Sequence, residues 1–169
     1  KAIIKHNTDF GIAWDTDFDR CYLFNKHGDI IHPYYVSGML AKIQLRENPE
    51  SHIIHDPRLI WHIVDVTKTY GGSLILSKSG HSLIKTKMRE HQAIYAGESS
   101  GHHYFKSFGY CDSGMIPWIL IMNELSRSQK TINHLFEDAI KQHPCLPETN
   151  YTLQSINKTM KHIYTQYAP

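Results

Sequence analysis

The 169-residue sequence lacks several features, and each absence narrows what the chain can be. No run approaches the ~18 consecutive apolar residues of a membrane span. Lysine and arginine form no dense cluster and the net charge is only +2, which disfavours nucleic acid as a partner. Three cysteines without a C-x-x-C pair do not make a disulfide framework. Residues 1–10 lack the apolar core of a signal peptide, so a cytoplasmic protein is expected.

What the sequence contains is an alternation of strand and helix patterns, with glycines between many of them. Strands are predicted over 10–14, 20–25, 51–56, 73–78, 93–98 and 103–105. Helices are predicted over 32–45, 58–70, 81–92, 112–128 and 131–143, and the polar tail 148–169 reads as a linker or an incomplete element. This order predicts the α/β class with a mixed, largely parallel sheet.

Loops that follow the strands of such a sheet often carry binding sites, and three of them are unusual here. They span residues 15–20, 78–81 and 97–102. The 13 histidines, in contrast, are scattered along the chain and form no metal-binding tract. The loops are therefore the places where the sequence predicts function.

The segment DTDFDR places three carboxylates at alternate positions directly after an apolar strand. Asp15, Asp17 and Asp19 can converge on one hard cation if the loop curls, and Mg²⁺ prefers such oxygen ligands. An EF-hand is excluded because Arg20 replaces its glycine and Lys26 its final glutamate. A phosphatase of the haloacid-dehalogenase type, with Asp15 as nucleophile, and a solvated acidic turn both stay open as alternatives.

The segment GESSGH fits the G-x-S-x-G pattern of a nucleophile elbow, which requires a helix directly after its serine. The residues that follow are typical of a strand or loop, so Ser99 is not predicted to be a nucleophile. Glu98 can instead accept two hydrogen bonds from sugar hydroxyls, and Ser100 can both donate and accept. Gly97 and Gly101 let the backbone approach a ligand, although a plain polar turn would look the same.

Together, FGIAWDTDFDRCYLF, KSGHSLIKTKM, GESSGHHYF and YCDSGMIPWIL resemble the α-D-phosphohexomutase superfamily, in particular its bacterial phosphomannomutase/phosphoglucomutase branch. The resemblance covers residues 1–145, and three motifs in order at suitable separations make it specific. It implies a three-layer domain with the sheet between helices. It also implies a reaction that moves phosphate between a phosphoserine and the 1- or 6-position of a hexose, through a bisphosphorylated intermediate.

The resemblance assigns roles to individual residues. The acidic segment matches a Mg²⁺ loop that usually reads Asp-Gly-Asp-Gly-Asp-Arg, and GESSGH matches a sugar-binding loop that usually reads Gly-Glu-x-Ser-Gly-His. The implied metal ligands are Asp15, Asp17 and Asp19; the implied substrate-binding residues are Glu98, Ser100 and His102; and the implied catalytic residues are Arg20, His81 and Arg58.

The sequence departs from the family in two ways. Thr16 stands where the family usually has glycine, and it would strain the loop if that position needed a positive φ. Residues 1–169 also contain no Thr-Ala-Ser-His-Asn-Pro-like phosphoserine loop and no Arg-x-Ser-Gly-Thr-like phosphate loop. The expected layout is therefore the end of a second domain over 1–20, a third domain over 21–143, and a linker or the start of a fourth over 144–169.

Three functions are compatible with these patterns. The first is the metal-loop and sugar-binding part of a mutase, which acts on mannose or glucose phosphates together with the remaining domains and is inactive alone. The second is a non-catalytic module that binds a sugar phosphate or a protein. The third is a small Mg²⁺-dependent phosphatase.

Overall fold

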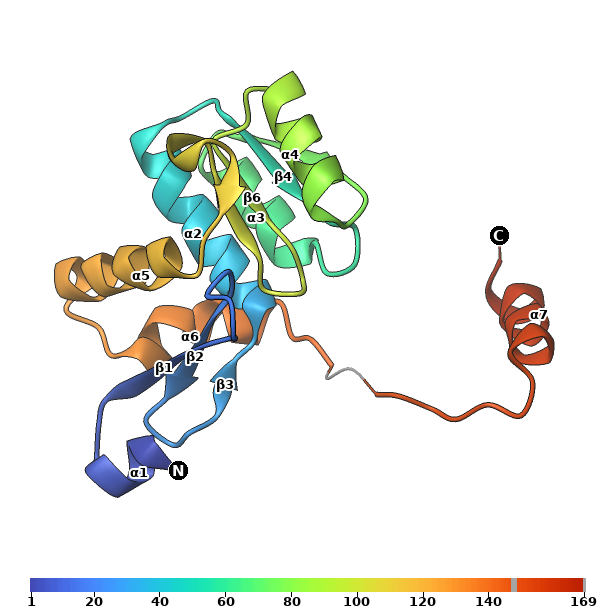
Figure 1. The fold of residues 1–169 in the computed structure, drawn as a ribbon, viewed down its shortest axis with the longest axis horizontal. Coiled ribbons are helices and arrows are strands. Elements are labelled where there is room, and N and C mark those ends of the chain that lie inside the picture. Colours follow the sequence, from blue (N-terminus) through green and yellow to red (C-terminus); the bar gives the residue numbers. More distant parts are fainter. Residues whose placement is uncertain (147–148, 169) are drawn as a thin grey trace.

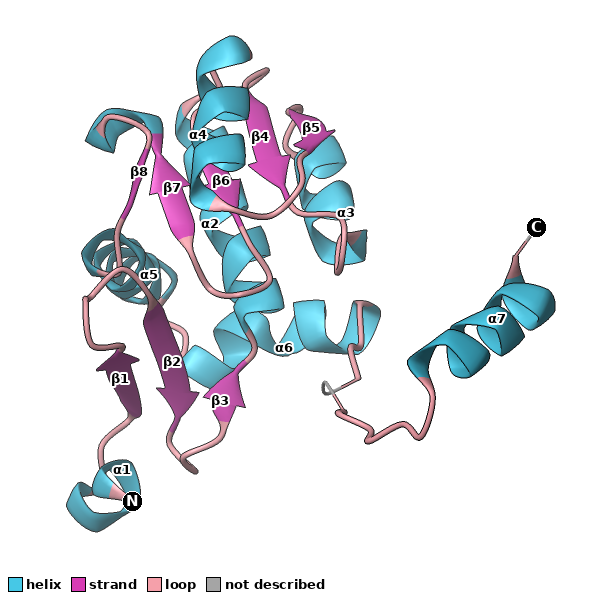
Figure 2. Ribbon diagram, turned by 45° about the vertical axis from the view of Figure 1, so that its right-hand side comes forward, coloured by secondary structure: helices cyan, strands magenta, loops and turns pink. Residues whose placement is uncertain are grey.

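The computed structural model describes residues 1–146 and 149–168, and its main sheet has five strands (Figures 1 and 2). They are β4 (His52–His55), β5 (Ser73–Leu76), β6 (Tyr95–Gly97), β7 (His103–Phe105) and β8 (Cys111–Asp112), in the spatial order β5-β4-β6-β7-β8. β4 pairs in parallel with β5 and β6, whereas β7 is antiparallel to both of its neighbours. Only β7 runs against the other four strands, which confirms the mixed, largely parallel sheet.

Helices cover both faces of this sheet (Figure 1). α2 (Pro33–Glu47) and α3 (Trp61–Thr69) pack on one face, and α4 (His81–Glu90) packs on the other. The side chains of successive residues in a strand point to opposite faces of the sheet. Ile53 joins the core under α2 and α3, whereas Ile54 packs with Ile84 and Met88 of α4. The expected three-layer α/β domain is confirmed.

A second, antiparallel sheet lies beside this domain. It consists of β1 (Phe10–Trp14), β2 (Cys21–Asn25) and β3 (Ile30–Ile31). α5 (Met115–Ser128) contacts both β2 and α2, and α6 (Ile132–Gln142) also contacts α2. Arg46 of α2 donates two hydrogen bonds, of 2.9 and 2.5 Å, to the buried carboxylate of Glu124 on α5. This contact fixes α5 against the three-layer domain.

Two helices begin three residues later than predicted, and one of them is α3, which begins at Trp61 rather than at residue 58. The apolar helix begins at Met115 rather than at residue 112, because Asp112 pairs in β8 and the Ser113 hydroxyl accepts hydrogen bonds from the Met115 and Ile116 amides. The tail, predicted to be a linker or an incomplete element, contains the helix α7 (Ile156–Tyr167), which has no buried residue and lies away from both sheets (Figure 1). Residues 148 and 169 of the predicted tail lie outside the described residues.

Four short elements among the described residues escaped the sequence patterns. They are α1 (Ala2–His6), a 3₁₀ turn over Lys106–Phe108 and the two-residue strands β3 and β8. Elements this short carry too few residues for hydrophobic periodicity to identify them. Among the described residues, no helix combines the length and the apolar character that crossing a bilayer requires.

Candidate active site

The loop of residues 15–20 joins β1 to β2 and curls, which is the condition for its three aspartates to converge. One carboxylate oxygen from each of Asp15, Asp17 and Asp19 lies within 4.8 Å of the other two. Arg20 closes the loop, since its backbone amide and its Nε donate to the two oxygens of Asp15 at 3.2 and 2.5 Å. Three oxygen donors therefore converge on one small volume at the surface.

Close backbone contacts hold this acidic loop against the start of α5. The Gly114 amide donates to the Phe18 carbonyl at 3.0 Å, and the Trp14 indole donates to the Gly114 carbonyl at 2.9 Å. A Cβ at Gly114 would lie 2.6 Å from the Phe18 carbonyl oxygen and 2.7 Å from that of Arg20. A glycine is therefore needed here so that the loop can approach.

Thr16 does not strain the acidic loop. The residue in the left-handed region is Phe18, with φ of 61°, and Thr16 does not have a positive φ. The conformational freedom of glycine is thus not required at position 16, and the departure from the family pattern leaves the curl of the loop intact.

The charges of the acidic loop suit a hard cation. Burial and the neighbouring Asp15 carboxylate raise the pKa of Asp19. Burial also acts to raise the pKa of Asp15, but the hydrogen bonds from Arg20 outweigh it and lower that pKa. Oδ1 of Asp19 is buried and has no hydrogen-bond partner among the described residues. A cation such as Mg²⁺ would satisfy this oxygen and offset the repulsion, so the residues fit the predicted metal.

The loop of residues 97–102 is a tight turn between β6 and β7. The Gly101 amide donates to the Glu98 carbonyl at 2.9 Å, and the Glu98 amide donates to the His102 carbonyl at 3.0 Å. A strand follows this turn instead of a helix, and the Ser99 hydroxyl donates to a carboxylate oxygen of Asp56 at 3.0 Å. The loop thus lacks the geometry of a nucleophile elbow, as the sequence indicated.

The carboxylate of Glu98 is buried and already hydrogen-bonded. Its Oε1 accepts from the Gly80 amide at 2.9 Å, and its Oε2 accepts from the Tyr104 hydroxyl at 2.7 Å. The Tyr104 hydroxyl is buried and held by this carboxylate, which raises its pKa. Glu98 therefore ties the start of α4 to β7, and each of its oxygens keeps one further lone pair for a ligand.

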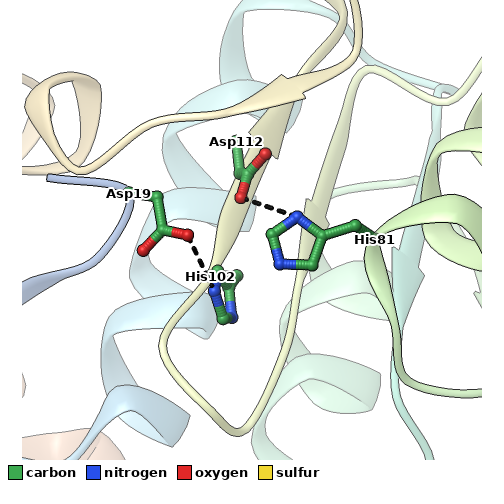
Figure 3. Close-up of side chains that lie close together, drawn as sticks. All are labelled: Asp19, His81, His102 and Asp112. Carbon is green, nitrogen blue, oxygen red and sulfur yellow. Dashed lines mark ion pairs between the residues drawn. The ribbon is translucent and has the colours of Figure 1, made fainter. Parts of the chain in front are cut away.

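His102 is where the two loops meet. Arg20 and His102 form an antiparallel backbone bridge, and His102 Nε2 lies 3.3 Å from Asp19 Oδ2. On its other side, His102 Nδ1 lies 3.0 Å from the Ser100 hydroxyl. The ring of His81, the first residue of α4, packs edge-on against the His102 ring at a centroid distance of 4.6 Å. Side chains from the acidic loop, the turn and α4 thus lie close together (Figure 3).

Arg58 approaches the same edge of the sheet from the loop after β4. Its side chain binds both oxygens of the fully buried Asp56, at 3.2 and 3.0 Å, and contacts the Ser79 hydroxyl at 3.4 Å. Burial acts against ionisation of Asp56, but hydrogen bonds from Arg58 and Ser99 lower its pKa to about 2. Asp56 is therefore ionised near neutral pH and ties Arg58 to the turn at Ser99.

The three-layer domain and these loops correspond to a known protein family. Residues 32–143 match the family model described as "Phosphoglucomutase/phosphomannomutase, alpha/beta/alpha domain III". The chain belongs to this family. The predicted boundaries at residues 20 and 143 stay predictions; the match begins at residue 32, and the β1–β2 hairpin spans position 20.

Curated relatives and solved structures agree with this family. The chain is 48% identical over 165 residues to a phosphomannomutase of Escherichia coli K12 and 46% identical over 167 residues to one of Vibrio cholerae. It covers 36% of each relative, whereas the alignments cover 95% and 98% of the chain. A phosphoglucomutase/phosphomannomutase family protein from Burkholderia thailandensis superposes with a TM-score of 0.72 and 30% identity over 88% of the chain and 32% of that protein. The chain therefore spans about a third of the length of these relatives.

Several residues of this phosphohexomutase domain were missed in the sequence. Asp56 and Asp112 contact predicted site residues, since Asp56 holds Arg58 and Asp112 Oδ2 lies 3.0 Å from His81 Nδ1. Lys85 is the third, and its Nζ lies 3.0 Å from Asp112 Oδ1. Asp56 follows a strand at the same sheet edge, and Lys85 lies one helical turn after His81, so position alone could have indicated both. Asp112 was predicted as a helix residue, and only the pairing of β8 places it here.

A large cavity of the structure does not coincide with the candidate site. A cavity of about 720 Å³ lies between β3, α2 and α6, lined by residues that include Ile31, Tyr35 and Phe136. None of the nine predicted site residues lines it. The candidate site of this family member is an exposed set of loops, recognised by its chemistry and not by its volume.

Proposed function

We propose that this chain is the metal-loop and sugar-recognition part of a phosphomannomutase/phosphoglucomutase, which interconverts hexose 6-phosphate and hexose 1-phosphate. The observation that carries the proposal is the meeting of the acidic loop and the sugar loop at His102, through the Arg20 bridge and the 3.3 Å contact to Asp19. A cation held by the three aspartates would lie next to the residues that would hold the sugar.

In this proposal, each group has a task set by its position. Mg²⁺ held by Asp15, Asp17 and Asp19 would stabilise the charge of the phosphoryl group during transfer. Arg20 and Arg58 supply positive charge near that group, and His81 with His102 can move or share a proton at the sugar oxygen. These roles rest on the family resemblance together with the contacts described above.

Sugar binding would involve the surface of the turn. Ser100 is half-buried and its hydroxyl faces His102, so it can exchange that contact for a sugar hydroxyl. The Glu98 side chain is only 3% exposed, which means that a sugar can reach it only after the turn shifts. The proposal therefore includes a small rearrangement of residues 97–102 on binding.

The phosphoryl donor is assigned to the remaining domains of the enzyme. Residues 1–169 contain no phosphoserine motif of this family, so the chain alone is proposed to be inactive as a mutase. The phosphatase alternative, with Asp15 as nucleophile, makes a different prediction, which the activity assay below tests.

Calorimetric titration of the chain with mannose 1-phosphate and with glucose 1-phosphate, each with Mg²⁺, tests the sugar-binding part of the proposal. We expect saturable binding that Ser100→Ala weakens about tenfold, the cost of roughly one lost hydrogen bond to a ligand. Ser107→Ala is the matched control, since Ser107 is exposed and lies outside the turn. Equal binding by both variants would contradict the assignment of the turn.

An activity assay tests the missing donor. The chain alone, with Mg²⁺ and a trace of hexose 1,6-bisphosphate, should not convert mannose 6-phosphate to mannose 1-phosphate. Appreciable turnover would show that the chain carries its own phosphoryl donor. Release of phosphate from a generic ester that Asp15→Asn abolishes would favour the phosphatase instead.

A further inference from the structure

Four side chains from four separate segments face one another beside the acidic loop (Figure 3). They are Asp19 of the acidic loop, His81 at the start of α4, His102 of the turn and Asp112 of β8. One nitrogen or oxygen from each lies within 4.8 Å of the corresponding atoms of the other three. Two imidazole nitrogens and two carboxylate oxygens thus share one small volume.

The potential ligand atoms point toward one another in pairs. His81 Nδ1 lies 3.0 Å from Asp112 Oδ2, and His102 Nε2 lies 3.3 Å from Asp19 Oδ2. The two imidazole rings are 4.6 Å apart and nearly perpendicular. Since each pair joins a nitrogen to an oxygen, small side-chain rotations suffice to direct all four atoms at one ion.

Outer contacts fix the orientation of two of these groups. The Ser100 hydroxyl lies 3.0 Å from Nδ1 of His102, which leaves Nε2 facing Asp19. Lys85 Nζ lies 3.0 Å from Oδ1 of Asp112, which leaves Oδ2 facing His81. Metal-binding histidines and carboxylates commonly have such partners on the atom that does not bind the ion.

Two carboxylate oxygens of the cluster have ion-pair contacts but no hydrogen bond. Asp112 is only 9% exposed at its side chain, and its buried Oδ2 lies 3.0 Å from His81 Nδ1 without forming a hydrogen bond. The buried Oδ1 of Asp19 likewise accepts no hydrogen bond among the described residues and lies 3.6 Å from Arg20 Nε. Buried carboxylate oxygens are costly without a hydrogen bond, so a cation bound at the cluster would stabilise both groups.

We propose that Asp19, His81, His102 and Asp112 form a transition-metal site, distinct from the three-aspartate loop, that binds Zn²⁺. A set of two imidazoles and two carboxylates suits Zn²⁺ in tetrahedral geometry, whereas Mg²⁺ favours an all-oxygen set. The two sites share Asp19, so an ion in one competes with an ion in the other. If the proposed function holds, Zn²⁺ is an inhibitor that also occupies His81 and His102.

The test uses Co²⁺, which replaces Zn²⁺ and absorbs strongly in the visible range when it is tetrahedral. We expect one equivalent of Co²⁺ to produce this absorption in the chain and one equivalent of Zn²⁺ to remove it. Asp112→Asn should weaken Co²⁺ binding about tenfold or more. Asp138→Asn, an exposed matched control on α6, and Asp17→Asn, which alters only the three-aspartate loop, should leave the absorption in place.

Each other outcome overturns the proposal. Absence of the tetrahedral absorption, or its persistence in Asp112→Asn, would place the ion elsewhere, for example on surface histidines. Its loss in Asp17→Asn but not in Asp112→Asn would place it in the acidic loop. His81→Gln removes another proposed ligand and serves as a second test of the site. Because His81 is half-exposed, this variant is expected to fold.

Failure of this site is distinguishable from failure of the proposed function. Asp112→Asn leaves all three aspartates of the acidic loop in place, so Mg²⁺ binding by that variant reports on the acidic loop alone. Binding of Mg²⁺ without the Co²⁺ absorption would refute only the second site.

Discussion

The acidic loop and the turn at residues 97–102 meet at His102, but they are built in opposite ways. The acidic loop is held mainly through its backbone and Arg20, and its Asp17 is exposed. In the turn, in contrast, polar side chains are already engaged: Glu98 with Gly80 and Tyr104, and Ser99 with Asp56. One loop is an open set of ligands, and the other is a prefolded part of the domain.

Because of this difference, substitutions in the acidic loop and substitutions in the turn should affect different properties, namely ligand affinity and folding stability. Changes to exposed aspartates should alter ligand binding and leave folding almost untouched, since their polar atoms contact water in the unbound chain. Changes to the buried partners of the turn should unfold the domain, because each removal leaves other buried groups without partners. Variants of Asp56, Gly114 and Thr16 test this division.

Asp56→Ala should lower the free energy of unfolding by about 4 kcal/mol, because it leaves Arg58 and the Ser99 amide without their buried anion. Asp17→Ala should change it by less than about 0.5 kcal/mol. Urea denaturation followed by circular dichroism measures both. Similar losses in the two variants would remove the distinction between the loops.

Gly114→Ala should cost about 2 kcal/mol and weaken Mg²⁺ binding, because its new methyl group would displace the Phe18 carbonyl and the acidic loop. The matched control is Gly71→Ala, where φ is 71° and no atom lies within 4 Å of the new methyl group. That variant should cost about 1 kcal/mol through its backbone alone and keep the Mg²⁺ affinity. Unchanged affinity in Gly114→Ala would show that the contact does not shape the loop.

The free energy of unfolding should fall in acid as Asp56 becomes protonated. Its pKa is about 2 in the fold, against 3.8 for a free aspartate, so ionised Asp56 favours the folded state. This contribution, about 2 kcal/mol, is complete above pH ~4 and is lost as the pH falls through 2. Unfolding free energies of the parent chain and Asp56→Asn, measured at pH 5 and pH 2, should therefore converge by that amount. A constant difference would contradict the ionised state.

Thr16→Gly should have the smallest effect. Because Thr16 does not need a positive φ, glycine relieves no strain there and only adds freedom to the unfolded chain. We expect a loss of about 0.5 kcal/mol and a Mg²⁺ affinity within about twofold of the parent. Calorimetry measures the affinity, and a large gain would mean that Thr16 does distort the loop.

The sequence predicted the motif loops and the long elements except α7, because periodicity and residue spacing are local properties. It indicated that three alternate aspartates can converge if their loop curls, and the missing helix after Ser99 argued against a nucleophile elbow. It could not predict that both loops meet at His102, since that contact depends on how the small sheet sits against α5. Asp112 was missed for the same reason, because its pairing partner lies in β7.

The histidines show most clearly what residue spacing in the sequence cannot predict. Their scatter along the sequence indicated no metal-binding tract, and that reading of the sequence is sound as far as neighbours in the chain are concerned. Folding nevertheless brings His81 and His102 to a ring distance of 4.6 Å. A site assembled from separate loops at one sheet edge has no signature in sequence spacing.

The most direct test of the central claim is an amide NMR titration of the chain with Mg²⁺. We expect saturable shifts at residues 15–20 that extend to His102 through its backbone bridge to Arg20. Asp17→Asn should abolish them, and Asp29→Asn, an exposed aspartate in the β2–β3 turn, should not. A folded chain that shows no shifts at residues 15–20, or equal shifts in both variants, would contradict the assignment of the acidic loop as the metal site.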